Sequence, residues 1–318
     1  MQRFAGMQTA PQLAAGSFLE EVLRGLSLRQ KALPSRFLYD ERGSELFERI
    51  TELPEYYPTR TEIALLKSSG PELREIVPPG AVIVEFGSGS CRKTELLLEA
   101  LDRPFAYISI EISASALFPA VRRIKRKFPS IAVHPVLGGF QDLGEMTLPF
   151  RSHPRAGFFP GSTIGNLTHD EAVFFLQSAR RFLGGDALFI VGADLQKPLD
   201  ILLPAYDDAE GVTAAFNRNI LTRINRELDG NFDPGLFEHS APYNAAEGRI
   251  EMHLRPAKPH RVRVAGHSFE FRPGETIHTE NSYKYTMAGF RALARDGGWD
   301  PVKAWTDKNN LFSLHVLA

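Results

Sequence analysis

The stretch VEFGSGSCRKT, at 84–94, has the composition of a ligand-binding turn. Gly87 and Gly89 follow an apolar run and precede a helical one, so the backbone of this turn can approach a ligand closely. The turn is not a dinucleotide fingerprint, because Arg92 stands where the third glycine of G-x-G-x-x-G is required. It is not a P-loop either, since Gly89 lies four positions before Lys93 instead of immediately before it.

The charged residues around this turn favour S-adenosylmethionine (SAM) as its ligand. Glu111 follows the next predicted strand, where a carboxylate can accept both ribose hydroxyls of an adenosyl group. The N-terminus of the following helix favours a carboxylate, and Lys93 can pair with the carboxylate of the methionine part. Gly87, Ser88 and Gly89 then form the loop beside the ligand. From these residues alone, an NAD site and a strand-to-helix turn without ligand remain open alternatives.

The segments on both sides of this turn are predicted to alternate between strand and helix. Strands are predicted at 81–86, 105–110, 131–137, 156–160 and 187–194, with helices at 93–101, 114–128 and 169–183. This alternation predicts a parallel, doubly wound sheet, in which ligands bind beyond the carboxyl ends of the strands.

The alternation stops after the fifth strand. Residues 197–255 are predicted to be helical and polar, with no strand before 248–256. Residues 261–272 are predicted to form a hairpin that turns near Gly266. A helix at about 286–297 and a final apolar strand then return to the sheet.

We therefore expect an α/β protein of two domains built from interleaved segments. Residues 61–196 plus 284–318 form the SAM-binding domain. Residues 197–283, joined by the helical segment 17–60, form a second domain. A chain of 318 residues with 43% hydrophobic side chains can bury a core large enough for both.

The net charge and the cysteine content indicate which binding partners and which cellular compartment to expect. The formal net charge of −1 gives no general attraction to nucleic acid or anionic lipid, and the basic run at 122–128 has apolar residues at helical spacing, as on a solvated helix. The single cysteine excludes an internal disulfide, and no signal-peptide core or membrane span is visible. We expect a cytoplasmic monomer that binds a small molecule and neither nucleic acid nor membrane.

Three long motifs resemble the histidine-specific Nα-methyltransferases of ergothioneine biosynthesis. They are FLYDERGSELFERITELPEYYPTRTE (37–62), FFPGSTIGNLTHDEA (158–172) and IHTENSYKYT (277–286). The resemblance extends from about residue 17 to the end of the chain. It implies a Rossmann-like class I methyltransferase sheet with a second, substrate-binding domain. It also implies that the α-amine of L-histidine is trimethylated to hercynine, using three SAM molecules and no metal.

The resemblance also implies a histidine pocket, which the residues of this chain match well. Tyr56 matches the tyrosine that hydrogen-bonds the imidazole, and Tyr39 the tyrosine near the α-amine and SAM. The other matches are Glu280 and Ser282 on the far side of the imidazole, Met252 beside the ring, Asn166 and Tyr206 at the α-carboxylate, and Phe47, Gly161 and Thr163 around the amine. Tyr39 and Asn166 are the candidate catalytic residues.

On the SAM side the resemblance has one departure. Gly87, Lys93 and Glu111 match in kind, although the ribose acid is more usually aspartate. After the third strand the family has Asp-Phe, whereas this chain has Gly139-Phe140. Phe140 can still pack on the adenine. The lost acceptor for the adenine amine could be replaced by Gln141, Asp142 or a backbone carbonyl.

Without the resemblance, Tyr56 and Tyr206 would be read as core tyrosines and Glu280 as a solvated carboxylate. Three other functions are compatible with parts of the sequence. They are a methyltransferase of the same fold acting on another amino acid or amine, a SAM-binding regulatory protein, and an NAD(P)-dependent oxidoreductase. Arg92 disfavours the last, and the complete pocket disfavours the first two.

Two further features could suggest chemistry. His253, His260 and His267 are evenly spaced but fall in a predicted strand, loop and hairpin, so we expect no metal site from them. Cys91 lies at a helix N-terminus, where thiolate character is favoured. We interpret it as a small residue that fills the loop.

Overall fold

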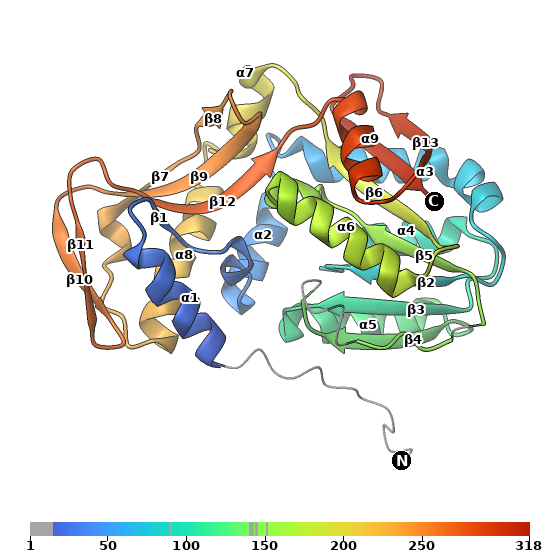
Figure 1. Ribbon diagram of the computed structural model, residues 1–318, viewed down its shortest axis with the longest axis horizontal. Helices are drawn as coiled ribbons and strands as arrows, with labels where there is room; N and C mark the ends of the chain where they lie inside the picture. Colours follow the sequence, from blue (N-terminus) through green and yellow to red (C-terminus); the bar gives the residue numbers. More distant parts are fainter. Residues whose placement is uncertain (1–14, 90, 140–142, 144–145, 151) are drawn as a thin grey trace, which may run out of the picture. The chain divides into compact units, whose positions relative to one another are not determined.

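The computed structural model describes residues 15–318 except 90, 140–142, 144–145 and 151, and it divides into two compact units (Figure 1). Unit 1 consists of Pro58–Gln196 and Lys284–Ala318. Unit 2 consists of the described chain up to Tyr57, together with Lys197–Tyr283. Each unit has its own sheet, so each can be described from its own contacts.

The described part of unit 1 contains one sheet in the strand order β13-β14-β6-β5-β2-β3-β4. Its parallel strands are β2 (Val82–Phe86), β3 (Ala106–Glu111), β4 (Ala132–Leu137), β5 (Arg155–Phe159) and β6 (Leu188–Asp194). The antiparallel pair β14 (Phe312–Leu317) and β13 (Pro301–Thr306) completes the sheet beside β6. β2, the first strand of this sheet along the chain, thus lies in the middle of the parallel part. The chain continues outward from it in both directions, as in Rossmann-like folds.

Helices cover both faces of this sheet (Figure 1). One face carries α3 (Tyr57–Ile76), α4 (Arg92–Ala100) and α5 (Ala114–Lys127), and the other carries α6 (His169–Leu183) and α9 (Met287–Asp296). Successive residues of β2 point to opposite faces: Val82, Val84 and Phe86 pack toward α6 and α9, and Ile83 packs toward the other three helices. The predicted parallel doubly wound sheet is therefore confirmed.

The described part of unit 2 begins with α1 (Ala15–Ser27), β1 (Lys31–Ala32), η1 (Ser35–Leu38) and α2 (Glu41–Glu52). After β6 it continues with α7 (Leu199–Leu202), η4 (Leu203–Ala205), α8 (Val212–Glu227), η5 (Pro234–Leu236), β7 (Phe237–Ser240) and β8 (Tyr243–Asn244). Its last strands are β9 (Arg249–Pro256), β10 (His260–Val264), β11 (His267–Phe271) and β12 (Ile277–Tyr283). The main sheet has the order β1-β12-β9-β7, and β8 also pairs with β9.

The strands predicted for residues 197–283 of unit 2 are partly wrong. The hairpin at 261–272 is confirmed as β10 and β11, with Ala265 and Gly266 both at positive φ in the turn. However, β7 and β8 lie within 197–255, where no strand was expected before 248. Both are short and pair with β9, so tertiary pairing decides their conformation where local pattern does not.

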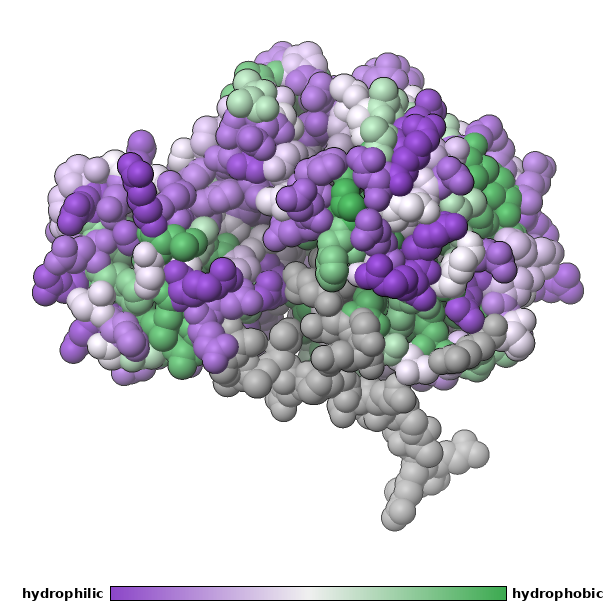
Figure 2. All heavy atoms as spheres, viewed as in Figure 1, coloured by the Kyte–Doolittle hydropathy of each residue, from purple (hydrophilic) through white to green (hydrophobic). Residues whose placement is uncertain are grey.

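The large hydrophobic side chains that are exposed are dispersed along the chain: Leu28, Phe105, Phe174, Leu199, Ile201 and Val302. Hydrophilic side chains cover most of the face seen in Figure 2. Among the described helices, none combines the length and the apolarity that crossing a bilayer requires.

Candidate functional site

The glycine turn of unit 1 is held by the carboxylate predicted to bind the ribose. Gly87 and Gly89 both have positive φ, which glycine adopts without strain. The backbone N–H of Gly89 donates to Glu111 Oε2 at 3.0 Å, and the N–H of Ser113 donates to Glu111 Oε1 at 3.0 Å. Glu111, at the end of β3, is thereby fixed against the turn that ends β2. This is the position at which doubly wound sheets bind the ribose of a nucleoside.

The serines below the turn are also fixed. Ser109 Oγ, on β3, donates to Ser88 Oγ at 2.7 Å, and both side chains are buried. The structure therefore brings together Gly87, Ser88, Gly89 and Glu111 at the carboxyl edge of the sheet. Phe140 lies outside the described residues, as do Gln141 and Asp142, the possible replacements for the missing aspartate, so the adenine contacts remain a prediction.

A second carboxylate, Glu85, is buried beneath this turn. The hydroxyls of Thr94 and Tyr107 each donate to Glu85 Oε2 at 2.5 Å. Burial raises the pKa of Glu85 to about 8, even though these hydrogen bonds favour the charged form. Glu85 is therefore a predominantly neutral acceptor at pH 7, which joins β2, β3 and the first turn of α4.

Cys91 is a buried thiol in this structure. Its side chain lies 3.5 Å from the hydroxyl of Tyr107, and burial, together with the nearby Glu85, raises the pKa of the Cys91 thiol to about 12. The thiolate character expected at a helix N-terminus is therefore overridden by burial. The interpretation of Cys91 as a residue that fills the loop agrees with this environment.

Lys93 has a partner that the sequence interpretation missed. Its Nζ lies 2.7 Å from Oε2 of Glu62, a carboxylate on α3 with no exposed surface. The backbone N–H of Gly161 also donates to both oxygens of Glu62, at 2.9 and 3.0 Å. The only sequence signal for this role was the position of Glu62 at the end of the motif 37–62.

Two glycines make room for this arrangement. A Cβ at Gly192, on β6, would lie 2.1 Å from Glu62 Oε1, which no side chain could tolerate. A Cβ at Gly161 would lie 3.2 Å from Lys93 Nζ, and Gly161 also has positive φ. The Glu62 carboxylate thus joins α3, α4 and the loop after β5 in a space that two glycines leave open.

The loop after β5 carries the remaining predicted residues of unit 1. Ser162 has positive φ and accepts a hydrogen bond from the backbone N–H of Asp194 at 2.9 Å. Thr163 Oγ1 donates to the carbonyl of Pro160 at 2.9 Å, and a single turn of η3 (Thr163–Asn166) follows. A capping box at Thr168 then begins α6. Asn166 is therefore half-buried on a short segment that is fixed at both ends.

In unit 2 the predicted aromatic residues form a continuous row. The ring centroids of Tyr39 and Phe47 are 5.5 Å apart, those of Phe47 and Tyr56 6.3 Å, and those of Tyr56 and Tyr206 6.4 Å. All three pairs meet edge to face, the geometry that aromatic quadrupoles favour. The row ends in a hydrogen bond of 2.8 Å between the Tyr206 hydroxyl and Ser282 Oγ.

Glu280 and Met252, two further predicted residues of unit 2, lie opposite one another in the sheet. Glu280, on β12, is the register partner of Met252, on β9, and Ser282 is the partner of Ile250. Side chains of paired residues point to the same face of a sheet. Met252, Glu280 and Ser282 therefore share one face, and Ser282 connects this face to the aromatic row.

The parallel sheet and the glycine turn at its carboxyl edge fit an α/β enzyme of the class I SAM-dependent methyltransferase type. The model of the family described as "Histidine-specific methyltransferase, SAM-dependent" matches residues 18–318, and the chain belongs to this family.

Curated relatives agree with this assignment. The chain is 41% identical over 315 residues to the histidine N-alpha-methyltransferase of Mycolicibacterium smegmatis, covering 96% of each protein. It is 39% identical over 304 residues to that of Mycobacterium tuberculosis, covering 94% of each. It is also 32% identical to ergothioneine biosynthesis protein 1 of Neurospora crassa, covering 91% of this chain and 33% of the fungal protein.

The environment of Glu85 predicts a pH dependence of stability. Because its pKa of about 8 lies above the ordinary 4.5, folded Glu85 holds its proton where unfolded Glu85 has lost it. Its contribution to the free energy of unfolding is therefore complete below pH 4.5 and declines as the pH rises toward 8. Glu85→Gln keeps a neutral acceptor for Thr94 and Tyr107 but cannot titrate. We expect its stability relative to the wild type to increase steadily between about pH 5 and 8.

Urea unfolding at a series of pH values measures this difference. Glu41→Gln, which removes an exposed carboxylate at the start of α2, is the control for the loss of a surface charge. Parallel curves for Glu85→Gln and the wild type would show that Glu85 is ionised in the folded protein at neutral pH.

Proposed function

We propose that this protein trimethylates the α-amine of L-histidine to hercynine, with SAM as methyl donor, as a step of ergothioneine biosynthesis. The observation that carries the proposal is the set of predicted acceptor residues in unit 2, whose aromatic row ends at the Tyr206–Ser282 hydrogen bond. Membership of the histidine-specific family supports the same substrate.

In this proposal the two units have different tasks, as the domain prediction assigns them. Unit 1 binds SAM, with Glu111 at the ribose and Lys93 at the methionine carboxylate. Unit 2 binds histidine through Tyr56, Tyr206, Glu280 and the residues near them. Asn166, Gly161 and Thr163 belong to unit 1, and we assign them to the carboxylate and the amine of the acceptor.

Methyl transfer from a sulfonium is an in-line displacement that needs a neutral nitrogen lone pair. Positioning alone can contribute about 7–11 kcal/mol to such a reaction. The acceptor amine, with an ordinary pKa of roughly 8, must first lose a proton, and the cationic sulfonium nearby disfavours a second positive charge. We assign no strong general base. The proton leaves to water or through Tyr39, which orients the amine without adding charge.

The aromatic row suits the product as well as the substrate. Each methyl transfer makes the nitrogen bulkier, and the final product carries a permanent positive charge. Aromatic faces attract quaternary ammonium groups without requiring a hydrogen-bond donor. Tyr39 and Phe47, the residues assigned to the surroundings of the amine, can therefore accept all three methylation states.

Recognition of the imidazole gives the expected selectivity. Glu280 can accept an imidazole N–H, and Ser282 or Tyr56 can satisfy the other ring nitrogen. An apolar amino acid would leave these groups unpaired, which is costly in a desolvated site. We also propose that the protein acts in the cytoplasm, where a reducing environment suits its one free cysteine, and that it is a monomer.

Mass spectrometry of purified protein incubated with SAM and an equimolar amino-acid mixture tests the function. We expect histidine alone to gain mass, by one, two and finally three methyl groups. Fragmentation should place all three on the α-nitrogen. Methylation of another amino acid in preference to histidine would instead support a same-fold methyltransferase of different specificity.

Replacement of Glu280 by alanine tests the assignment of the imidazole site. A hydrogen bond to a charged group contributes about 1.5–3 kcal/mol, so we expect histidine affinity to fall roughly 10- to 100-fold. SAM affinity should be unchanged. Calorimetric titration of both ligands measures this, with Glu238→Ala, an exposed carboxylate of the same sheet, as the control. Unchanged histidine affinity in Glu280→Ala would contradict the assignment.

A further inference from the structure

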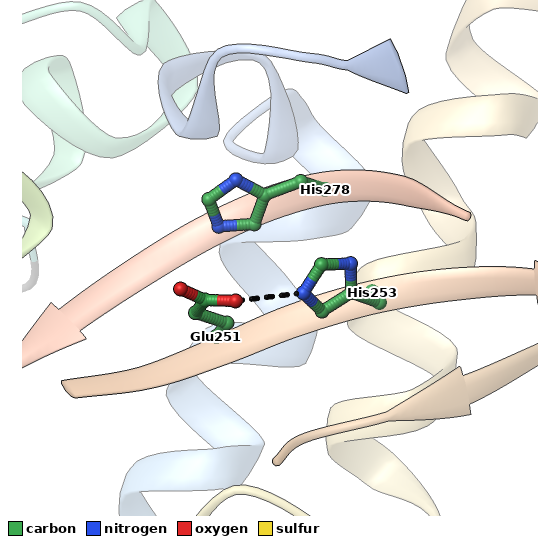
Figure 3. Close-up of side chains that lie close together, drawn as sticks. All are labelled: Glu251, His253 and His278. Atoms are coloured by element: carbon green, nitrogen blue, oxygen red, sulfur yellow. Dashed lines mark hydrogen bonds and ion pairs between the residues drawn. The ribbon is translucent and has the colours of Figure 1, made fainter. Parts of the chain in front are cut away.

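The sheet of unit 2 carries a second cluster of chemically active side chains, on β9 and β12. Glu251, His253 and His278 each point a potential metal-binding atom toward the others, and these atoms all lie within 4.8 Å of one another (Figure 3). Among the described residues, this is the one group of three or more His, Cys, Asp or Glu side chains with such spacing. Neither the family assignment nor the proposed histidine site uses it.

A β-bulge places this cluster on the opposite face from the proposed histidine site. Glu251 and His253 flank Met252 on β9, so they point away from the face that Met252 occupies. His278 is the register partner of His253, and Glu280 is the partner of Met252. His278 and Glu280 would share a face in a regular strand. The bulge between them sends their side chains to opposite faces.

The spacing of the closest pair fits two ligands of one small metal ion. Two donor atoms about 2.1 Å from a tetrahedral ion are about 3.4 Å apart. In the structure, His253 Nε2 and Glu251 Oε2 are 3.1 Å apart. That contact requires a proton between the two atoms, and an ion would take the place of this proton. The imidazole rings of His253 and His278 are stacked with centroids 4.9 Å apart. A ring nitrogen of His278, the third donor, therefore lies near the other two.

Outer hydrogen bonds already orient two of the three ligands. His253 Nδ1, the nitrogen away from Glu251, lies 3.0 Å from Thr276 Oγ1. Glu251 Oε1 accepts from Asn244 at 2.9 Å and from Arg249 at 2.8 Å, which leaves Oε2 directed at His253. Metal-binding histidines and carboxylates typically make such hydrogen bonds to neighbouring residues.

One charged group close to the cluster must be considered. The Arg249 guanidinium donates to Glu251 Oε1 at 2.8 Å. The Arg249 guanidinium opposes a cation here, so we expect weaker binding than at a cysteine-rich zinc site.

We propose that Glu251, His253 and His278 form a binding site for a divalent transition metal ion of the Zn²⁺ type. Imidazole and carboxylate donors suit Zn²⁺, Ni²⁺ and Cu²⁺ better than Mg²⁺ or Ca²⁺. An ion held there joins β9 to β12, the strands that carry Met252, Glu280 and Ser282 on their other face. Its role is to stabilise this sheet, and it takes no part in methyl transfer.

Metal titration of the full-length, untagged and chelator-treated protein tests the proposal. With Zn²⁺ alone, in the absence of SAM and histidine, we expect one ion per chain by elemental analysis after desalting. His253→Asn and His278→Asn should each weaken this uptake by about tenfold or more. The matched control is His267→Asn, an exposed histidine in the hairpin of the same unit, which should retain the site.

A spectroscopic measurement on the wild type avoids any effect of substitution on folding. Cu²⁺ bound at this site should show electron paramagnetic resonance splitting from two imidazole nitrogens. Excess Zn²⁺ should remove that signal by displacement. The proposal is overturned if Zn²⁺ is not taken up stoichiometrically, or if His253→Asn and His278→Asn bind it as tightly as His267→Asn does.

Discussion

One buried carboxylate determines the arrangement of the ligand-binding edge of unit 1. Glu62 has no exposed surface, yet its oxygens accept hydrogen bonds from the Gly161 backbone and from Lys93. These contacts fix α3, the first turn of α4 and the loop after β5 to one another. A buried carboxylate without such partners would cost several kcal/mol. The structure therefore strongly favours the arrangement in which Lys93 and Gly161 both face Glu62.

The position of Lys93 matters because its ammonium can pair with two anions. In the structure its ammonium is paired with Glu62. An ammonium carries three donors in a flexible arrangement, so Lys93 can keep one contact to Glu62 while it pairs with the SAM carboxylate that we propose as its second partner. Glu62 then acts as the support that keeps a flexible side chain in a single position. This differs from a lysine on a solvated helix face, which would lose more side-chain entropy on binding a ligand.

The sheet of unit 2 shows how a single irregularity can give one strand two roles. Because of the bulge at 278–280, His278 and Glu280 point to opposite faces of β12. One face joins Glu280 to Met252 and, through Ser282, to the aromatic row. The other face holds the Glu251, His253 and His278 cluster. A regular strand with the same residues would bring His278 and Glu280 to the same face.

Much of unit 1 could be predicted from sequence, since it depends on local periodicity. The apolar runs and glycine turns gave the parallel strands of its sheet, and the helix at 169–183 was predicted with the bounds it has in the structure. Glu62 could not be found in this way, because its partners Lys93 and Gly161 are distant in the chain. His253 was grouped with His260 and His267 by even spacing, whereas strand pairing places it beside His278. The short strands β7 and β8 were missed because only pairing with β9 defines them.

A double-mutant cycle between Glu62 and Lys93 tests whether this pair holds the edge of unit 1 together. The measured quantity is the free energy of unfolding in urea. Lys93→Met alone should be strongly destabilising, because it leaves Glu62 buried without its cation. Adding Glu62→Gln should restore much of that loss, with a coupling free energy of about 1–3 kcal/mol. Additive effects of the two substitutions, within about 0.5 kcal/mol, would show that the pair does not hold this edge together.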